Sequence, residues 1–260
     1  MSKSEVEAHK QNRDAWDARA RRKDVFTRPA NQAELDDPLK KLDPRGWYGP
    51  SVIGKRVLCL GAGGGRHGPL LAKAGADVTV VDLSPEMLEL DHQMAMRHAL
   101  KIATVQASID NLSPLEAQSF DLVIQPVSSC YVPSVLRVYQ EVARVLVTGG
   151  TYVSQHKTPT NLQCATEFTS GGYNLQAPYY SGAALPAAPS SRFREAGTLE
   201  FVHRWEELVG GLCRSGFTLE DLVEVQRGSA DAAPGSFDHR CHYVAPYVRL
   251  LARRKPAIIL

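Results

Sequence analysis

Three glycines at alternate positions and one acidic residue further along form the pattern in this sequence that is best suited to chemistry. The glycines are Gly61, Gly63 and Gly65, and the acidic residue is Asp82. Glycine has no Cβ, so a glycine turn brings the backbone close to a ligand, and amide groups at the start of a following helix suit an anionic group. A carboxylate at the end of the next strand can accept hydrogen bonds from ribose hydroxyl groups. The four residues therefore predict a nucleoside site.

A strand, a helix and a second strand are needed to bring these residues together, and residues 56–82 supply them. Residues 57–60 form a short apolar run typical of a parallel strand that is buried on both faces. Apolar residues between 70 and 74 follow at helical spacing, and residues 78–81 form the next strand. This unit is half of a nucleotide-binding α/β domain.

The glycine spacing distinguishes two families that share such a unit. A dinucleotide fingerprint, GxGxxG, needs a glycine where this chain has Arg66. The GxGxG spacing resembles motif I of the class I S-adenosylmethionine-dependent methyltransferases, and DLSPEML at residues 82–88 resembles the segment that follows it. SFDLVIQ at 119–125, EVARVLVTGG at 141–150 and TYVSQH at 151–156 are similar to the family's fourth strand, next helix and fifth strand. The resemblance covers residues 55–156 and, more loosely, the tail from residue 205.

The resemblance implies a Rossmann-like, doubly wound α/β fold whose seven-stranded, mostly parallel sheet ends in an antiparallel strand, with helices on both faces. The remaining strands are expected at residues 102–106, 120–125, 152–155, 217–225 and 247–252, and helices after Ser84, from 133 to 146 and from 205 to 214. We expect residues 1–50 to form a helical and irregular lead-in to a methyltransferase domain at 51–260. Residues 157–200, rich in Pro, Gly, Ser, Ala and Tyr, are expected to insert a substrate lid.

The resemblance also implies which residues hold S-adenosylmethionine. The glycine-loop amides would face its methionine part, Asp82 its ribose, and Ser108 and Ile109 its adenine, unless a shift of register gives the role of Ser108 to Asp110. A plain connecting turn and a helix-capping role for Asp82 are the alternative interpretations. The full set of expected contacts is Trp16, Gly61, Ala62, Gly63, Gly65, Asp82, Leu83, Met87, Ser108, Ile109, Gln125 and Ser128.

Methyl transfer from a sulfonium depends mainly on holding the acceptor in line, so a catalytic acid or base is not essential. Where the acceptor must lose a proton, His156 after the fifth strand and Tyr131 after the fourth are the candidate catalytic residues, with His203 a weaker one. His156 could equally be a core or lid-anchoring residue. The aromatic residues of the lid either line an acceptor pocket or pack the lid onto the sheet; they are Phe168, Tyr173, Tyr179, Tyr180 and Phe193.

Composition favours an ordinary cytoplasmic enzyme. The 260 residues are 43% hydrophobic, and no apolar run reaches the ~18 residues that a membrane span needs. The first residues lack a secretory apolar region, and five cysteines without a CxxC pair indicate free thiols. A net charge of +2 gives no support to nucleic-acid binding. His239, Cys241 and His242 have metal-ligand chemistry, but on the strand expected there neighbouring side chains alternate between faces, so no metal is predicted.

These observations predict a methyltransferase that acts on a small-molecule acceptor, as a monomer or homodimer. A nicotinamide-dependent oxidoreductase would need a glycine at position 66 and, in the short-chain type, a YxxxK pair, and neither is present. An amino-directed DNA methyltransferase would carry [DN]PP[YF] where QPVS stands at residues 125–128. A nucleic-acid or protein substrate, and a scaffold that binds the nucleoside without turnover, remain alternatives.

Overall fold

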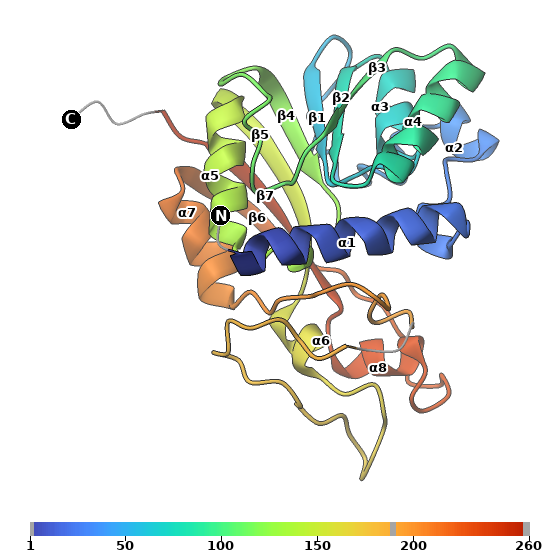
Figure 1. The fold of residues 1–260 in the computed structure, drawn as a ribbon, viewed down its shortest axis with the longest axis vertical. Coiled ribbons are helices and arrows are strands. Elements are labelled where there is room, and N and C mark those ends of the chain that lie inside the picture. The colour runs from blue at the N-terminus through green and yellow to red at the C-terminus, as the bar shows by residue number, and fades with distance from the viewer. Residues whose placement is uncertain (1–2, 188–190, 257–260) are drawn as a thin grey trace.

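The computed structural model describes residues 3–187 and 191–256 and contains one seven-stranded sheet with helices on both faces (Figure 1). The strand order is β3-β2-β1-β4-β5-β7-β6, and β7 runs antiparallel to both of its neighbours. This confirms the predicted fold class. The strands are Arg56–Leu60 (β1), Asp77–Asp82 (β2), Ile102–Gln106 (β3), Phe120–Gln125 (β4), Leu146–Lys157 (β5), Phe217–Glu224 (β6) and Tyr247–Arg254 (β7).

The side chains of β1 alternate between two hydrophobic cores, one on each face of the sheet. Val57 and Cys59 pack with α3 and α4, whereas Leu58 and Leu60 pack with α5. All four side chains are fully buried, which explains why this strand reads as a continuous apolar run. The helices that form these layers are α3 (His67–Lys73), α4 (Pro85–His98) and α5 (Val135–Val145).

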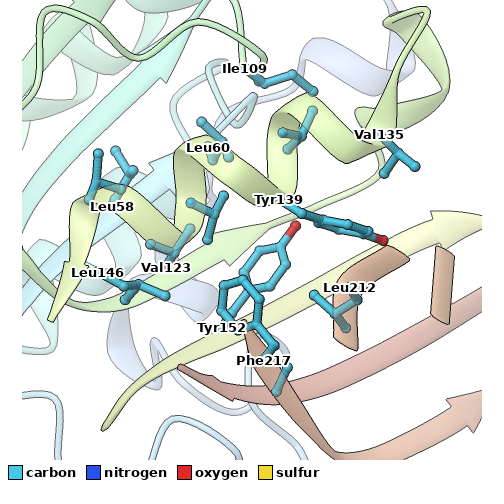
Figure 2. Packing of buried hydrophobic residues seen from close by; sticks show 14 of the residues in the cluster. Leu58, Leu60, Ile109, Val123, Val135, Tyr139, Leu146, Tyr152, Leu212 and Phe217 are labelled. Atoms are coloured by element: carbon cyan, nitrogen blue, oxygen red, sulfur yellow. The ribbon is translucent and has the colours of Figure 1, made fainter. Parts of the chain in front are cut away.

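The core beneath α5 is built around aromatic rings (Figure 2). The ring of Tyr139 on α5 lies edge-on to that of Tyr152 on β5, with 6.1 Å between centroids, and Tyr152 lies 5.7 Å from Phe217 on β6. The Tyr139 hydroxyl donates a hydrogen bond to the carbonyl of Leu208, and the Tyr152 hydroxyl donates one to the side chain of Gln125. The polar tips of both tyrosines are thus satisfied, and Tyr152 fixes a residue at the end of β4.

The N-terminal residues form a long helix, α1 (Lys3–Arg21), that runs across the end of the sheet at which the parallel strands finish (Figure 1). It is tied to the end of β2 by the Ser84 hydroxyl, which donates to Asp17 at 2.5 Å. The lead-in predicted for residues 1–50 also contains a short helix, α2 (Gln32–Asp36), because Asn31 and Glu34 form a capping box at its start. A single 3₁₀ turn, η1 (Val25–Thr27), precedes it.

One element of the C-terminal part differs in type from the sequence expectation. The strand expected to carry His239, Cys241 and His242 is instead a helix, α8 (Phe237–Tyr243), which Ser236 caps through the N–H of His239. Its buried residues recur at helical spacing, so the pattern was present but short. Among the residues described, no group of three possible ligands could hold a metal ion.

The other differences concern boundaries. β5 extends beyond the predicted strand at both ends, and the helix predicted for residues 205–214 is a π-helical turn, η3 (Glu206–Gly210), followed by α7 (Gly211–Arg214). The segment predicted to be a lid, of which 188–190 lie outside the described residues, carries α6 (Pro159–Gln163) and isolated bridges but no strand of the sheet. None of the helices in the described ranges is long and apolar enough to cross a membrane.

Candidate functional site

A cavity of about 530 Å³ lies at the edge of the sheet where the parallel strands end, and α1 passes over that edge (Figure 1). Its lining includes residues at or just after the ends of β1 to β5, residues of α1, and the first residues of α8 and β7. The carboxyl ends of parallel strands beside a change in strand order are where such sheets bind ligands, and the volume suits a small-molecule site. The nucleoside site predicted from the sequence therefore coincides with a real cavity.

The glycine loop forms the floor of this cavity because nothing larger fits. A Cβ at Gly63 would lie 2.9 Å from the Cβ of Met87 and 3.0 Å from a carboxylate oxygen of Asp82. Gly61 has a φ of +58°, in the left-handed region, and a Cβ there would lie 2.7 Å from Ser128. The lack of a side chain at these positions therefore lets Met87, Asp82 and Ser128 pack directly against the loop where it lines the cavity.

The amide groups of the loop have partners within the protein. The N–H of Gly61 donates to the carbonyl of Val81, that of Gly63 to Asp82 at 2.9 Å, and that of Gly64 to Asp91 at 2.9 Å. The expectation that these three amides face the ligand's carboxylate is therefore wrong. A signal for this was the acidic residue at position 91, which sequence reasoning did not consider.

Asp82 lines the cavity and is not the cap of α4, because Ser84 caps that helix through the N–H of Met87. Its second carboxylate oxygen accepts the N–H of Ser84 at 3.0 Å, just before α4. Burial raises the pKa of Asp82 to about 6, although the N–H groups of Ser84 and Gly63 act in the opposite direction. The carboxyl group is therefore close to its ionisation midpoint in mildly acidic solution.

Asp91 lies directly beneath the glycine loop and is fully buried. Burial raises its pKa to about 7, against the effect of the loop amides that bond to it. One of its carboxyl oxygens has no hydrogen-bond partner among the described residues. Protonation removes the negative charge and so lowers the cost of burying this carboxyl group.

Most of the predicted contacts line the cavity, and they come from widely separated parts of the sequence. Gly65 does not: a Cβ there would meet Leu90, Met94 and Pro29, so this glycine serves the packing behind the loop. Gln125 does not either, but its side-chain amide donates to the hydroxyl of Ser128, which does. The predicted residues that line the cavity are Trp16, Gly61, Ala62, Gly63, Asp82, Leu83, Met87, Ser108, Ile109, Ser128 and Tyr131.

The two possible registers after β3 are distinguished by the structure. Ser108 lines the cavity, whereas Asp110 is buried outside it and accepts a hydrogen bond from the Ser108 hydroxyl at 2.5 Å. Burial alone would raise the pKa of Asp110, but His9 of α1, 3.2 Å away, and Ser108 hold it below its usual value. Asp110 therefore anchors α1 to the loop that carries Ser108.

His156 does not reach the cavity, which contradicts its predicted role as a base. Its neighbours on β5, Gln155 and Lys157, line the cavity, so strand alternation turns His156 to the opposite side. Both of its ring nitrogens contact serine hydroxyls, those of Ser129 at 2.7 Å and Ser154 at 2.8 Å, and burial lowers its pKa to about 3. It is a core histidine.

Neither of the other candidate catalytic residues is suited to accept a proton. His203 is buried outside the cavity, with its ring nitrogen 2.9 Å from the carbonyl of Ser129. Tyr131 lines the cavity, but its hydroxyl donates to Glu195 at 2.7 Å, and burial together with Glu195 raises its pKa well above the usual value. Tyr131 is therefore a neutral hydrogen-bond donor.

A buried ion-pair network next to Tyr131 was not predicted from the sequence. The ammonium of Lys157 lies 2.7 Å from Glu195 and 2.6 Å from Glu200, and Arg194 pairs with Glu200 as well. Burial disfavours the charge on Lys157, but the two carboxylates hold its pKa above the usual value. Extending the predicted fifth strand from residue 155 to residue 157 would have placed the side chain of Lys157 on the same side as that of Gln155, toward the cavity. Glu195 belongs to a segment without strand or helix periodicity, so no such signal was present.

The aromatic residues of the predicted lid do not line the cavity. Phe168 and Tyr173 pack against each other and against His239 and Tyr243 of α8, with centroid separations between 4.9 and 5.9 Å. Tyr180 is 80% exposed. The acceptor-pocket interpretation is therefore wrong for these residues, and Phe168 and Tyr173 pack against α8 rather than onto the sheet.

Comparisons with known proteins agree with this site. Residues 58–154 match a family model described as a methyltransferase domain. The chain is 34% identical over 232 residues to the uncharacterized methyltransferase YbaJ of Bacillus subtilis, covering 84% of this chain and 90% of that protein. It is 32% identical over 120 residues to a ubiquinone biosynthesis O-methyltransferase of Vibrio vulnificus, covering 46% of this chain and 48% of that enzyme.

Among solved structures, an S-adenosylmethionine-dependent methyltransferase from Mesorhizobium loti has the same fold, with a TM-score of 0.61 and 23% identity over 85% of this chain and all of that one. The oxidoreductase alternative is set aside, because the matched residues include the glycine loop, Asp82 and the first five strands. This chain belongs to the class I S-adenosylmethionine-dependent methyltransferases.

Proposed function

We propose that this methyltransferase acts on a small-molecule acceptor that binds in the cavity beside S-adenosylmethionine. The observation that carries the proposal is the cavity itself, which is limited to about 530 Å³ and lies beneath α1. A polymer would need an open groove, whereas here Trp16 and Tyr131 lie edge-on to each other with 5.6 Å between their ring centroids, and both line the cavity. S-adenosylmethionine supplies a methyl group that is already activated on sulfur.

The residues present fit S-adenosylmethionine. Asp82 and Leu83 line the cavity beside Gly63 and suit the ribose, and Ser108 and Ile109 suit the adenine end. Because the loop amides are already bonded, the methionine carboxylate needs a positive side chain. Arg28 suits this role, since it lines the cavity two residues before Ala30, whose N–H donates to the carbonyl of Gly65.

The chain's own part in the reaction is to position the acceptor and exclude water. Tyr131 offers a neutral phenol that Glu195 holds in one orientation, and Lys157 holds Glu195 in turn. Fixed groups of this kind lower the entropic cost of bringing two reactants into line, which supplies much of the rate in methyl transfer. No proton acceptor is assigned.

Titration calorimetry with S-adenosylhomocysteine tests where the nucleoside binds. Gly63→Ala should weaken binding at least about tenfold, since the added carbon meets Met87 and Asp82. Gly172→Ala is the matched control, because a Cβ at Gly172 has no neighbour within 4 Å. Equal affinities in the two variants would contradict the proposed location.

Radiolabel transfer tests the acceptor class. The enzyme is incubated with methyl-labelled S-adenosylmethionine and a cell extract separated by size. We expect the label in the small-molecule fraction. Label that appears in the protein or nucleic-acid fraction would overturn the proposal in favour of a macromolecular substrate.

A further inference from the structure

The cavity lining carries an excess of positive side chains. Six cationic residues line it, against two carboxylates, Asp82 and Glu195. Lys41 and Arg66 are paired with Glu34, and Lys157 is paired with Glu195 and Glu200. The three cationic residues of the lining without an ion-pair partner in the described part of the chain are Arg28, Arg192 and Arg227.

These three arginines lie at two ends of the cavity. Arg28 is beside the glycine loop at the end of β1. The antiparallel strand β7 starts at Tyr247, opposite Lys157, the last residue of β5. Arg227 follows the last residue of β6, so Arg227 and Tyr247 both lie at the end of the sheet where the parallel strands finish. With β4 and β5 between β1 and β7, the spacing of ~4.8 Å per strand separates the two ends by about 14 Å. The second end of the cavity therefore lies three strand positions away from the glycine loop.

Arg192 and Arg227 are each placed over an aromatic ring of the cavity wall. The guanidinium of Arg192 lies 4.7 Å from the ring centroid of Phe237, and that of Arg227 lies 5.9 Å from that of Tyr247. Both rings belong to the cavity lining, and both charges act, together with Arg240, on the thiol of Cys241, where they oppose the pKa increase that burial causes. Asp238 acts on the same thiol, but it forms no ion pair with either arginine.

We propose that Arg192 and Arg227 form a subsite for an anionic group, a carboxylate or a phosphate, of the methyl acceptor. This inference rests on the proposed function, since it places the acceptor in the cavity that also holds S-adenosylmethionine. Stacking on a ring leaves the edge of a guanidinium free, and that edge matches carboxylate and phosphate oxygens with two parallel hydrogen bonds. Lys157, between the two ends, is already neutralised by its carboxylates and is not the anchor.

Three probes of similar size test the subsite: benzoate, phenyl phosphate and the neutral benzamide. Each is titrated calorimetrically at constant ionic strength, with and without saturating S-adenosylhomocysteine. At least one of the anions should bind about tenfold more tightly than benzamide, as expected for charge-assisted hydrogen bonds. The anion that is preferred identifies the group as a carboxylate or a phosphate.

The double variant Arg192→Met/Arg227→Met should lose this preference while its affinity for S-adenosylhomocysteine stays unchanged. Arg97→Met, an exposed arginine of the last turn of α4 outside the cavity, is the control for a lost surface charge. Equal binding of all three probes, or an unchanged anion preference in the double variant, would overturn the subsite. If the wild-type protein failed to bind S-adenosylhomocysteine, the proposed function would fall instead, and the titrations without it would still report on the arginines.

Discussion

The ionisation of single carboxyl groups decides how the cavity responds to pH. Asp82 has a pKa of about 6, and it serves a ribose best when it is ionised and acts only as an acceptor. Below pH 6 the folded protein holds a proton on this group. We therefore expect the affinity for S-adenosylmethionine to fall about tenfold from pH 7 to pH 5, measured by titration calorimetry.

Two variants separate the contribution of Asp82 from that of the neighbouring Asp91. Asp82→Asn should bind weakly at both pH values and lose the pH dependence. Asp91→Asn should keep most of it, because Asp91 lies beneath the loop and outside the cavity lining. If the pH dependence of binding disappeared in Asp91→Asn but persisted in Asp82→Asn, the responsible group would be Asp91 and our assignment to Asp82 would be wrong.

Asp91 makes a separate prediction about stability. Its folded pKa of about 7 lies above the unfolded value of 3.8, so the folded state retains the proton longer. A raised pKa stabilises the fold at low pH, and this contribution is lost as the pH rises toward 7. The free energy of unfolding of the wild type relative to Asp91→Asn should therefore decrease from pH 5 to pH 8, measured by urea unfolding. A difference that does not change with pH would contradict a buried proton.

At the scale of elements, Asn12 is one of several buried side chains that hold α1 in place. The amide of Asn12 donates to the carbonyl of Tyr131 at 2.7 Å and accepts the N–H of Leu199 at 2.7 Å, so it joins α1 to η2 (Ser129–Tyr131) and to the predicted lid. Asn12→Ala leaves these groups buried without partners and should cost about 2–3 kcal/mol of stability in chemical denaturation. Gln11→Ala, which removes one exposed hydrogen bond from the same helix, should cost far less.

The ion pairs between β5 and the segment after it predict a second loss of stability. Lys157→Met removes the cation from two buried carboxylates and should cost about 3–5 kcal/mol, because uncompensated buried charge is unfavourable. Lys41→Met removes a 66% exposed partner of Glu34 and should cost less than about 1 kcal/mol. Similar losses in the two variants, measured by urea unfolding, would show that burial does not strengthen the network.

How far the sequence predicts the site depends on whether an element is periodic. Asp82, Ser108 and Ser128 lie at or after the ends of apolar strands that are visible in the sequence, and all three line the cavity. His156 was misplaced because one residue along a strand reverses the direction of a side chain. Arg192 follows no strand or helix, so only the tertiary fold brings it to the cavity.

At the scale of the whole molecule, the cavity is closed by residues from Asn12 to Tyr247, nearly the full length of the chain. A ligand that contacts all of these segments should slow local opening in each of them. We expect S-adenosylhomocysteine to reduce hydrogen exchange at residues 61–65, in α1 and around residues 126–131, measured by mass spectrometry. Protection confined to residues 56–90 would mean that α1 does not cover the bound nucleoside.

The position of β7 between β5 and β6 bears on how the protein is made. Of the seven described strands, β7 is synthesised last but occupies an interior place in the sheet, so β6 has no partner until β7 has been made. A nascent chain that ends before residue 247 leaves an unpaired edge on β5 and a second one on β6, and such edges favour aggregation. Termination before residue 247 therefore removes β7, leaves β6 unpaired, and also removes the ring of Tyr247 against which the guanidinium of Arg227 packs.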